Sequence, residues 1–312
     1  MKFAHILHSF YGEHWHIMPD AWHRYHVVLQ EALRRPDPSH RQARESRPLA
    51  LAHSLALPAD SARRKFPVVG PVDDESGAPF AEQMQGFGPI AVIPVHGPLG
   101  RRLSMMTLMC GGCDYILLAQ MCEIALADPQ TKVVVFDHDS PGGQGNGHTE
   151  CAAAVEQLAA VKPTLAYTGG TCASASYGLA ARCGEILASP GARVGSIGTI
   201  ICAEDDSAQW AMQGVSLELF ASAPLKATGA SGKKWNEDDR SYIRERMLQA
   251  DAVFKSGIEK GRPQLTPAAY SGAWFFAQKV ASAPGTDGLA CKLIDSIAPD
   301  LATVVTTLAA TV

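Results

Sequence analysis

A serine at the start of a predicted helix is the first candidate for chemistry in this chain. Ser174 lies in the run TCASASYGLAA, residues 171–181, where small neighbours allow close approach. Backbone N–H groups face outward at a helix N-terminus, so a serine placed there can act as a nucleophile beside an anion-binding site. Ser176 competes for this role. Ser174 is favoured because the N–H of Ala175 could then help to bind an oxyanion.

A glycine pair upstream supplies a second part of such a site. The run SPGG at 140–143 follows a predicted strand. Glycine reaches backbone angles closed to other residues and leaves its N–H sterically open. The Gly143 amide could therefore point at an oxygen that becomes anionic in a transition state. By itself the motif is equally compatible with an ordinary strand-to-helix turn.

A serine nucleophile also needs a base, and three side chains are candidates. His138 and His148 flank the glycine pair in the sequence. Lys226 lies in the otherwise uncharged run FASAPLKATG, residues 220–229, where burial could favour its free amine. The residues alone leave the choice open, because a lysine in such a run can equally be an exposed loop residue.

Hydrophobic patterns predict alternating strands and helices beyond residue 90. Strands are expected over 90–99, 132–137, 163–167 and 185–188, and helices over 115–127, 147–161 and 174–183. This alternation predicts an α/β fold with a mainly parallel sheet and right-handed crossovers. Active sites of such sheets lie at the carboxyl ends of the strands, where the glycine pair and Ser174 both fall.

Composition narrows the class of protein. The 312 residues are 46% hydrophobic and 19% charged, and the net charge of −4 disfavours a nucleic-acid partner. No uninterrupted apolar run reaches the length of a membrane span. Eight scattered cysteines are typical of buried thiols in a reducing compartment, which favours the cytoplasm. Cys110 and Cys113 lack two further ligands at zinc-site spacing, so neither a metal nor a cofactor is expected.

The first 86 residues differ from the rest and are predicted to form an extension. Six of the eleven histidines lie in residues 1–34, but their spacing fits no closed metal site. Apolar periodicity predicts a helix over 20–34. The composition of residues 35–86 is typical of a linker with one short helix at about 49–57. We expect the extension to be a docking element or a pro-segment.

Several short motifs, taken in their order, resemble the S49 peptidases, the signal-peptide-peptidase A family, which has the ClpP/crotonase fold. The resemblance covers about residues 88–299. Its motifs are IAVIPVHG at 90–97, DSPGG at 139–143, ASASY at 173–177, VGSIGT at 194–199, SGAW at 271–274, and GL at 288–289 with Asp295. Lys226 follows Ser174 by 52 positions (226 − 174), which matches the Ser-to-Lys spacing of that family.

The resemblance implies a role for each candidate. Ser174 would be the nucleophile, and Lys226, rather than either histidine, the general base. The amides of Gly143 and Ala175 would form the oxyanion hole. Four further residues would bind substrate or shape the site: Ser140, Gly142, Gly195 and Ser196. The family usually has Ala-Ser-Gly-Gly-Tyr around its nucleophile, and here Ala175 and Ser176 replace both glycines.

The N-terminal region is similar to that of the phage and prophage branch of the family, the head-maturation proteases. We therefore expect a homo-oligomeric serine endopeptidase that acts on scaffold and capsid proteins, in the host cytoplasm or the immature phage capsid. The expected division is an extension over 1–86, a peptidase domain over 87–299 and a C-terminal tail over 300–312. Three alternatives stay open: signal-peptide-peptidase-like degradation of peptides in a bacterium, a non-catalytic capsid-assembly protein, and a crotonase-type acyl-CoA enzyme that uses Glu150.

Overall fold

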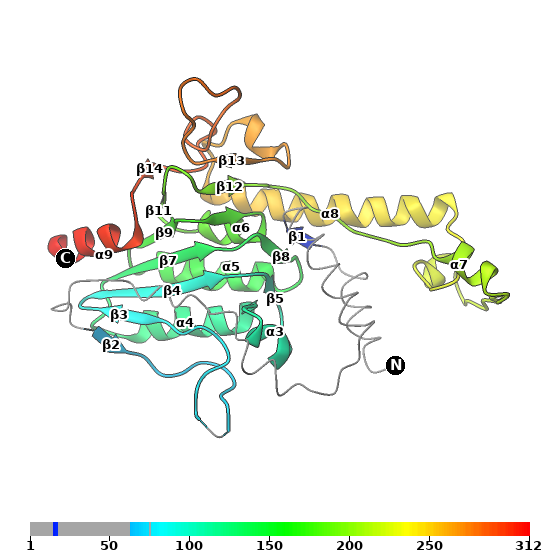
Figure 1. Cartoon of the computed structure of the whole chain (residues 1–312), viewed down its shortest axis with the longest axis horizontal. Helices are drawn as coiled ribbons and strands as arrows, with labels where there is room; N and C mark the ends of the chain where they lie inside the picture. The colour runs from blue at the N-terminus through cyan, green and yellow to red at the C-terminus, as the bar shows by residue number, and fades with distance from the viewer. Residues whose placement is uncertain (1–14, 18–62, 75) are drawn as a thin grey trace.

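A seven-stranded sheet forms the centre of the molecule (Figure 1). The computed structural model describes residues 15–17, 63–74 and 76–312. In spatial order the strands are β14 (Ser296–Ile297), β11 (Glu185–Ala188), β9 (Thr164–Thr168), β7 (Val133–Asp139), β4 (Ile90–His96), β3 (Gln85–Phe87) and β2 (Arg63–Lys65). The first five pair in parallel and the last two antiparallel. The predicted α/β class with a mainly parallel sheet is confirmed.

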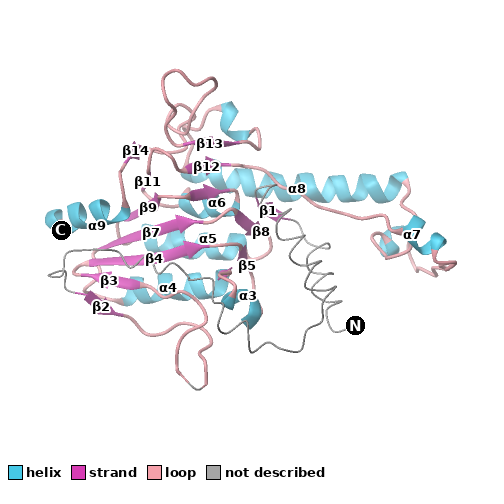
Figure 2. Ribbon diagram, viewed as in Figure 1, coloured by secondary structure: helices cyan, strands magenta, loops and turns pink. Residues whose placement is uncertain are grey.

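Helices pack on both faces of this sheet, and those of one face lie behind the strands in Figure 2. One face packs against α4 (Tyr115–Ala127), α5 (His148–Ala159) and α6 (Ala175–Ala180), and the other against α9 (Leu301–Thr311). Strand β4 shows why both faces are apolar, because its alternate side chains enter different cores. Ile93 belongs to the core under α4 to α6, whereas Val92 belongs to the smaller core that includes α9.

Two small sheets lie beyond the carboxyl ends of the central strands. The first has the order β1 (Trp15–Ile17), β8 (Gly142–Gln144), β5 (Leu99–Gly100) and β6 (Cys113–Asp114). The second has the order β10 (Thr171–Ala173), β12 (Arg193–Gly195) and β13 (Trp274–Phe276). A parallel bridge between Ser140 and Cys172 joins the two segments that lead to the glycine pair and to Ser174. The short helix α3 (Met105–Met109) connects β5 to β6.

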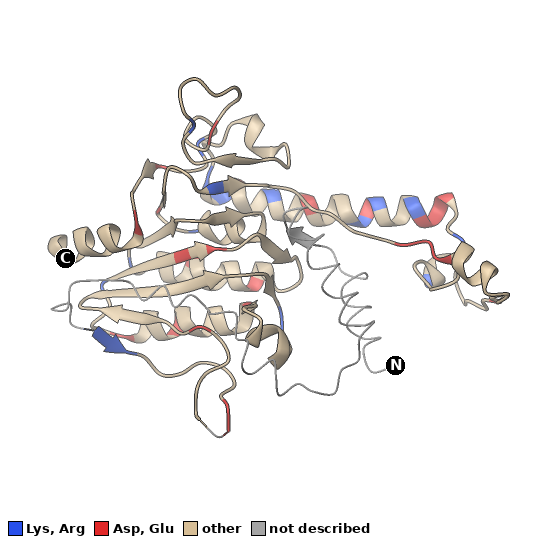
Figure 3. Ribbon diagram, viewed as in Figure 1, with Lys and Arg blue, Asp and Glu red and all other residues tan. Residues whose placement is uncertain are grey.

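A long helix carries part of the chain away from the sheet. Helix α8 (Glu237–Gly261) has 25 residues and is therefore about 37 Å long. Its C-terminal half buries Phe254 and Ile258, whereas its N-terminal half projects from the body (Figure 1). Charged side chains of both signs line the projecting half (Figure 3), as expected for a helix facing water. We call residues 203–250 the arm. The arm also holds α7 (Ser207–Met212) and the 3₁₀ helix η2 (Pro224–Ala227), and η3 (Pro267–Tyr270) follows α8.

The strands and helices expected from periodicity are present, with ends that shift by up to three residues. Two segments differ in character from the expectation. The described residues of the expected linker contribute β2 and β3 to the main sheet, and the expected tail forms α9. The predicted helices at 20–34 and 49–57 lie outside the described residues, and the division into domains stays a prediction. Among the described helices, none is both long enough and apolar enough to cross a membrane.

Candidate active site

Ser174 stands at a sharp turn between β10 and α6 with an unusual backbone conformation. Its φ is 53° and its ψ is −119°, which places a residue with a Cβ in a region that favours glycine. Such a conformation costs about 1–3 kcal/mol and persists only where the surroundings enforce it. A strained strand-to-helix turn of this kind presents the serine of a nucleophile elbow. The backbone geometry thus favours Ser174 over Ser176 as the candidate nucleophile.

Hydrogen bonds on both sides fix this turn. The Ser174 amide donates to the carbonyl of Gly195 at 2.7 Å, and the Ser174 carbonyl accepts from the amide of Gly178 at 2.9 Å. The hydroxyl Oγ lies 3.5 Å from the carbonyl of Gly198, too far for a strong hydrogen bond. Gly195 and Ser196 both have positive φ, 101° and 52°, and lie directly beside the serine. The segment that includes them therefore lies against the turn at Ser174.

Backbone hydrogen bonds join the segment that carries the glycine pair to the segment that carries Ser174. Gly142 is two residues beyond Ser140, and Ser174 is two residues beyond Cys172, so the bridge between Ser140 and Cys172 brings the two segments together. Gly142 has a φ of 101°, and its amide donates to Oγ of Ser140 at 3.2 Å. A Cβ on Gly143 would lie 1.9 Å from the backbone oxygen of Leu99. Only glycine fits at position 143.

Ser176, the second serine, is part of the core. It is fully buried in α6, with its Oγ 2.8 Å from Nδ1 of His138. Burial lowers the pKa of His138 to about 3, so this ring is neutral at pH 7. Its Nε2 is buried and has no hydrogen-bond partner in the described part of the chain. This buried pair links α6 to β7, and the hydroxyl of Ser176 does not face solvent.

His148, the other histidine considered as a base, faces the backbone of α6. Its Nε2 lies 3.1 Å from the carbonyl of Ala175, and its ring packs edge-on against Phe254. Burial lowers the pKa of His148 to about 4, and the contact with Ala175 offsets only part of that effect. The ring is neutral at pH 7 and supports the start of α6.

A single chain does not bring Lys226 to Ser174. Lys226 is exposed in η2, which lies against the N-terminal part of α8 in the arm. The hydroxyl of Thr228 donates to the carboxylate of Asp239 at 2.6 Å, which ties this segment to the first turn of the helix. Ile258 is buried at the body end of the same helix. It follows Asp239 by 19 residues, which is about 28 Å along the helix axis.

The carboxylate of the acyl-CoA alternative differs in burial from the candidate site residues. Glu150 is exposed on α5, whereas Ser174 and Gly143 are buried. No group of three His, Cys, Asp or Glu side chains that could hold a metal ion occurs among the described residues.

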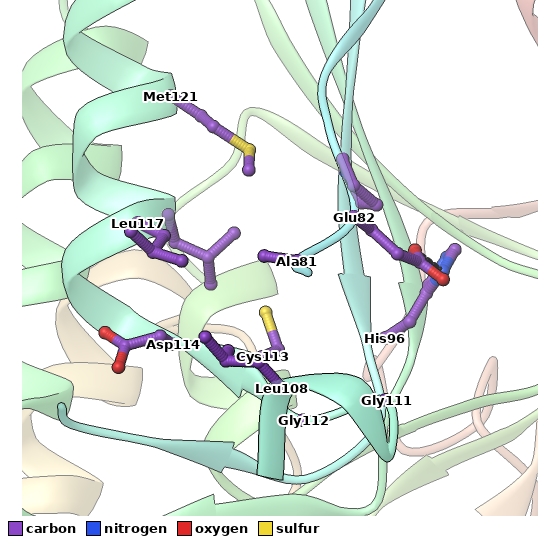
Figure 4. Close-up of a pocket in the computed structure, with 12 residues that line it drawn as sticks. Ala81, Glu82, His96, Leu108, Gly111, Gly112, Cys113, Asp114, Leu117 and Met121 are labelled. Atoms are coloured by element: carbon purple, nitrogen blue, oxygen red, sulfur yellow. Dashed lines mark ion pairs between the residues drawn. The ribbon is translucent and has the colours of Figure 1, made fainter. Parts of the chain in front are cut away.

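A second polar cluster, which the sequence reasoning missed, lies beside a small pocket near the end of β4 (Figure 4). The ring of His96 contacts Oδ2 of Asp137 at 3.0 Å and Oε2 of Glu82 at 2.5 Å. Burial by itself would lower the pKa of His96, but the hydrogen bonds to both carboxylates outweigh it and raise the pKa to about 10. A sequence signal existed, because in the parallel pairing of β4 and β7 the register partner of Asp137 is Pro94, and His96 lies two positions further along on the same face. The contribution of Glu82 had no such signal.

Comparison with known proteins gives one family match and several relatives. The sequence model of peptidase family S49 matches residues 156–311. The head-tail preconnector protein GP5 of Enterobacteria phage P21 is 30% identical over 210 residues, which is 66% of this chain and 42% of that protein. The capsid assembly protease C of Escherichia phage lambda is 29% identical over 185 residues, 59% of this chain and 42% of that protein. The chain thus spans less than half the length of these relatives.

Solved structures overlap with the fold at low identity. An enoyl-CoA hydratase from Shewanella pealeana has a TM-score of 0.41 at 12% identity, covering 73% of this chain and 72% of that chain. A membrane-bound stomatin-specific protease, 1510-N, has a TM-score of 0.38 at 15% identity, covering 69% and 83%.

Proposed function

The chain belongs to peptidase family S49, and we propose that it is a serine endopeptidase with Ser174 as its nucleophile and Lys226 as its general base. The strained backbone of Ser174, beside a glycine that tolerates no side chain, is the observation that carries the proposal. Strain of this kind is kept where a group must be held in one reactive position. A serine in an ordinary packing position would adopt helical or extended angles instead.

The proposed reaction proceeds through an acyl-enzyme. Ser174 Oγ attacks the carbonyl carbon of the peptide, and Lys226 Nζ takes the hydroxyl proton and passes it to the departing amine. The amides of Gly143 and Ala175 donate to the anionic oxygen of each tetrahedral intermediate. Water, deprotonated by the same lysine, then releases the acyl group and regenerates the serine. Ser140, Gly142, Gly195 and Ser196 shape the walls of this site.

We assign the lysine to a neighbouring copy of the chain. Lys226 lies in η2, which is tied to the first turn of α8 at the projecting end of the arm. The same end exposes large apolar side chains, including Met212 at 85% and Phe220 at 93% of their surface. Docking of the arm on a second copy would bury these groups and remove water from the lysine, which favours the free amine that a base requires.

The names of the relatives support a proposal for the substrate class. The phage relatives are named a capsid assembly protease and a head-tail preconnector protein. We infer that this chain cleaves scaffold or capsid proteins of an assembling phage head. The test is co-expression with those proteins and a comparison of intact masses between the wild type and Ser174→Ala. Cleavage that persists in Ser174→Ala would exclude this serine as the nucleophile.

Labelling with a fluorophosphonate probe tests the nucleophile directly. We expect Ser174 to be modified in the wild type, Ser176→Ala to retain labelling and Ser174→Ala to lose it. Lys226→Ala and Lys226→Arg should both lose proteolysis, because an arginine stays protonated and cannot act as a base. Lys234→Ala, an exposed lysine on the same arm, is the matched control and should stay active.

Mixed assemblies test whether the dyad forms between copies. Ser174→Ala and Lys226→Ala are each inactive alone, but each carries the residue that the other lacks. If neighbouring copies share a site, co-expression of the two variants should restore up to about a quarter of the wild-type activity, because random mixing completes that fraction of sites. No recovery in assemblies shown to contain both variants would place both members of the dyad in one chain.

A further inference from the structure

The segment Trp15–Ile17 pairs with the strand that carries the glycine pair. Strand β1 lies beside β8 (Figure 1). The two strands are antiparallel, with Trp15 opposite Gln144 and Ile17 opposite Gly142. Strand β8 pairs with β5 on its other edge, where Leu99 lies opposite Gly143. Both edges of β8 are therefore filled, one from the body and one by residues more than 120 positions earlier in the chain.

Without β1, the outer edge of β8 would be free to pair with another extended chain. A strand of this kind binds an extended peptide through main-chain hydrogen bonds, and such bonds tolerate many sequences. The glycines at 142 and 143 add no side chain that would block the approach. The same strand runs on from Ser140, whose neighbour across the bridge, Cys172, lies two residues before Ser174. A peptide on this edge would thus lie beside the candidate nucleophile.

We infer that the outer edge of β8 binds polypeptide substrates as an antiparallel strand, and that residues 15–17 of the chain itself occupy it as an internal competitor. The inference rests on the proposed function for the identity of the ligand, an extended polypeptide. Ser174 is fully buried in this arrangement, in keeping with a site that is closed to bulky substrates. A tethered occupant acts at an effective concentration of about millimolar, so it excludes weakly binding peptides until it leaves the edge.

The pairing is antiparallel, which also sets the direction of the substrate. Since Ile17 lies opposite Gly142 and Trp15 opposite Gln144, the occupant runs from the Gln144 end of β8 toward the Gly142 end. A substrate that replaces it would run the same way. The carboxyl-terminal side of the bound segment would then lie toward Ser140.

Backbone variants separate this role from side-chain packing. A triple variant with Trp15→Pro, His16→Pro and Ile17→Pro removes all three N–H donors of β1. The matched control, with Trp15→Ala, His16→Ala and Ile17→Ala, keeps those donors and changes only side chains. Hydrogen exchange of the segment Gly142–Gln144 should be at least tenfold faster in the proline variant than in the wild type and unchanged in the alanine control. Equal protection in all three proteins would show that β1 does not hold this edge.

Turnover and binding then test competition. Cleavage of fluorescein-labelled, unfolded casein should be at least tenfold faster in the proline variant than in the alanine control. Faster exchange without faster cleavage, in a protein whose Ser174 labels normally, would overturn the inference and leave β1 as a simple edge cover.

A readout without catalysis keeps this inference separate from the proposed function. In a Ser174→Ala background, excess unfolded casein should restore protection at Gly142–Gln144 in the proline variant and leave the alanine control unchanged. This result would support the peptide-binding edge even if Ser174 proved not to be the nucleophile. If casein left the vacated edge unprotected, β8 would not be a peptide-binding strand.

Discussion

The amide of Ser174 donates to the carbonyl of Gly195 across 2.7 Å, and this bond ties the candidate nucleophile to the end of β12. Ala173 and Gly195 are partners in the parallel pairing of β10 and β12, so the bond extends the ladder by one step into the turn. The chain must then reverse at once into α6, which leaves Ser174 at a φ of 53°. The fold enforces the strain at this position, and the position is the one that a reactive serine needs.

Substitution at Ser174 should reveal this strain as a gain in stability. Ser174→Gly and Ser174→Ala both remove the hydroxyl, but only glycine adopts the positive φ without a steric cost. We expect Ser174→Gly to be more stable than Ser174→Ala by about 1 kcal/mol in urea denaturation, with both variants inactive. A Ser174→Gly variant less stable than Ser174→Ala would show that the turn is not strained. Ser176→Gly, inside the helix, should instead lose stability.

The two serines of this segment should separate activity from stability. Ser176→Ala removes the partner of His138 Nδ1 in the core, so a buried polar atom loses its hydrogen bond. We expect a loss of about 1–3 kcal/mol in the free energy of unfolding, with proteolysis and probe labelling kept per folded molecule. Ser174→Ala should show the reverse, with activity lost and stability nearly unchanged. Loss of labelling in folded Ser176→Ala would instead make Ser176 the reactive group.

Strong local patterns made most of the fold predictable. The β-branched run of β7 and the 3.6-residue period of α4 are formed by residues that are themselves buried in the core. Both elements were therefore predicted to within two residues of their observed ends. Helix α8 was not predicted, because its projecting half faces water and carries few apolar residues at helical spacing. Its N-terminus did carry a signal, the capping box formed by Asn236 and Asp239.

Only part of the site was predictable, because the position of a residue in the sequence determines its place in the fold only where regular elements fix that place. The order of motifs placed Gly143 beside Ser174 because both follow neighbouring parallel strands, and the sheet brings their ends together. The distance from Ser174 to Lys226 along the chain carries no such constraint, because the arm between them leaves the body. The pairing of β1 with β8 was equally hidden, since it involves only three residues, and no strand was predicted there.

A side chain at position 143 should disrupt β8, the strand that carries the glycine pair. The Cβ of Gly143→Ala would lie 1.9 Å from the backbone oxygen of Leu99, and backbone cannot move aside as a flexible side chain can. We expect proteolysis to fall at least about 100-fold, as for loss of an oxyanion donor, with a smaller fall in stability. Gly198→Ala is a control in the same site, because its Cβ would meet only an ordinary contact at 3.7 Å. Activity kept in Gly143→Ala would exclude this strand from catalysis.

The cluster around His96 should make stability depend on pH with a definite sign. The pKa of His96 is about 10 in the folded chain and about 6.5 in the unfolded chain, so the folded state binds the proton more tightly between these values. The ion pairs contribute fully to the free energy of unfolding below about pH 6.5, and this contribution disappears as the pH rises through about 10. For a partly exposed group we expect about 1 kcal/mol at pH 6, seen as the difference between wild type and His96→Gln in urea denaturation.

His148, a buried neutral histidine, provides a control in which stability should change with pH in the opposite direction. Burial lowers the pKa of His148 to about 4, so here the unfolded chain binds the proton more tightly between about pH 4 and 6.5. The stability of the wild type relative to His148→Gln should therefore rise with pH across that window, whereas the difference at His96 falls with pH across its own higher window. If the His96 difference did not shrink between pH 6.5 and 9.5, Glu82 and Asp137 would not hold the ring in its charged form.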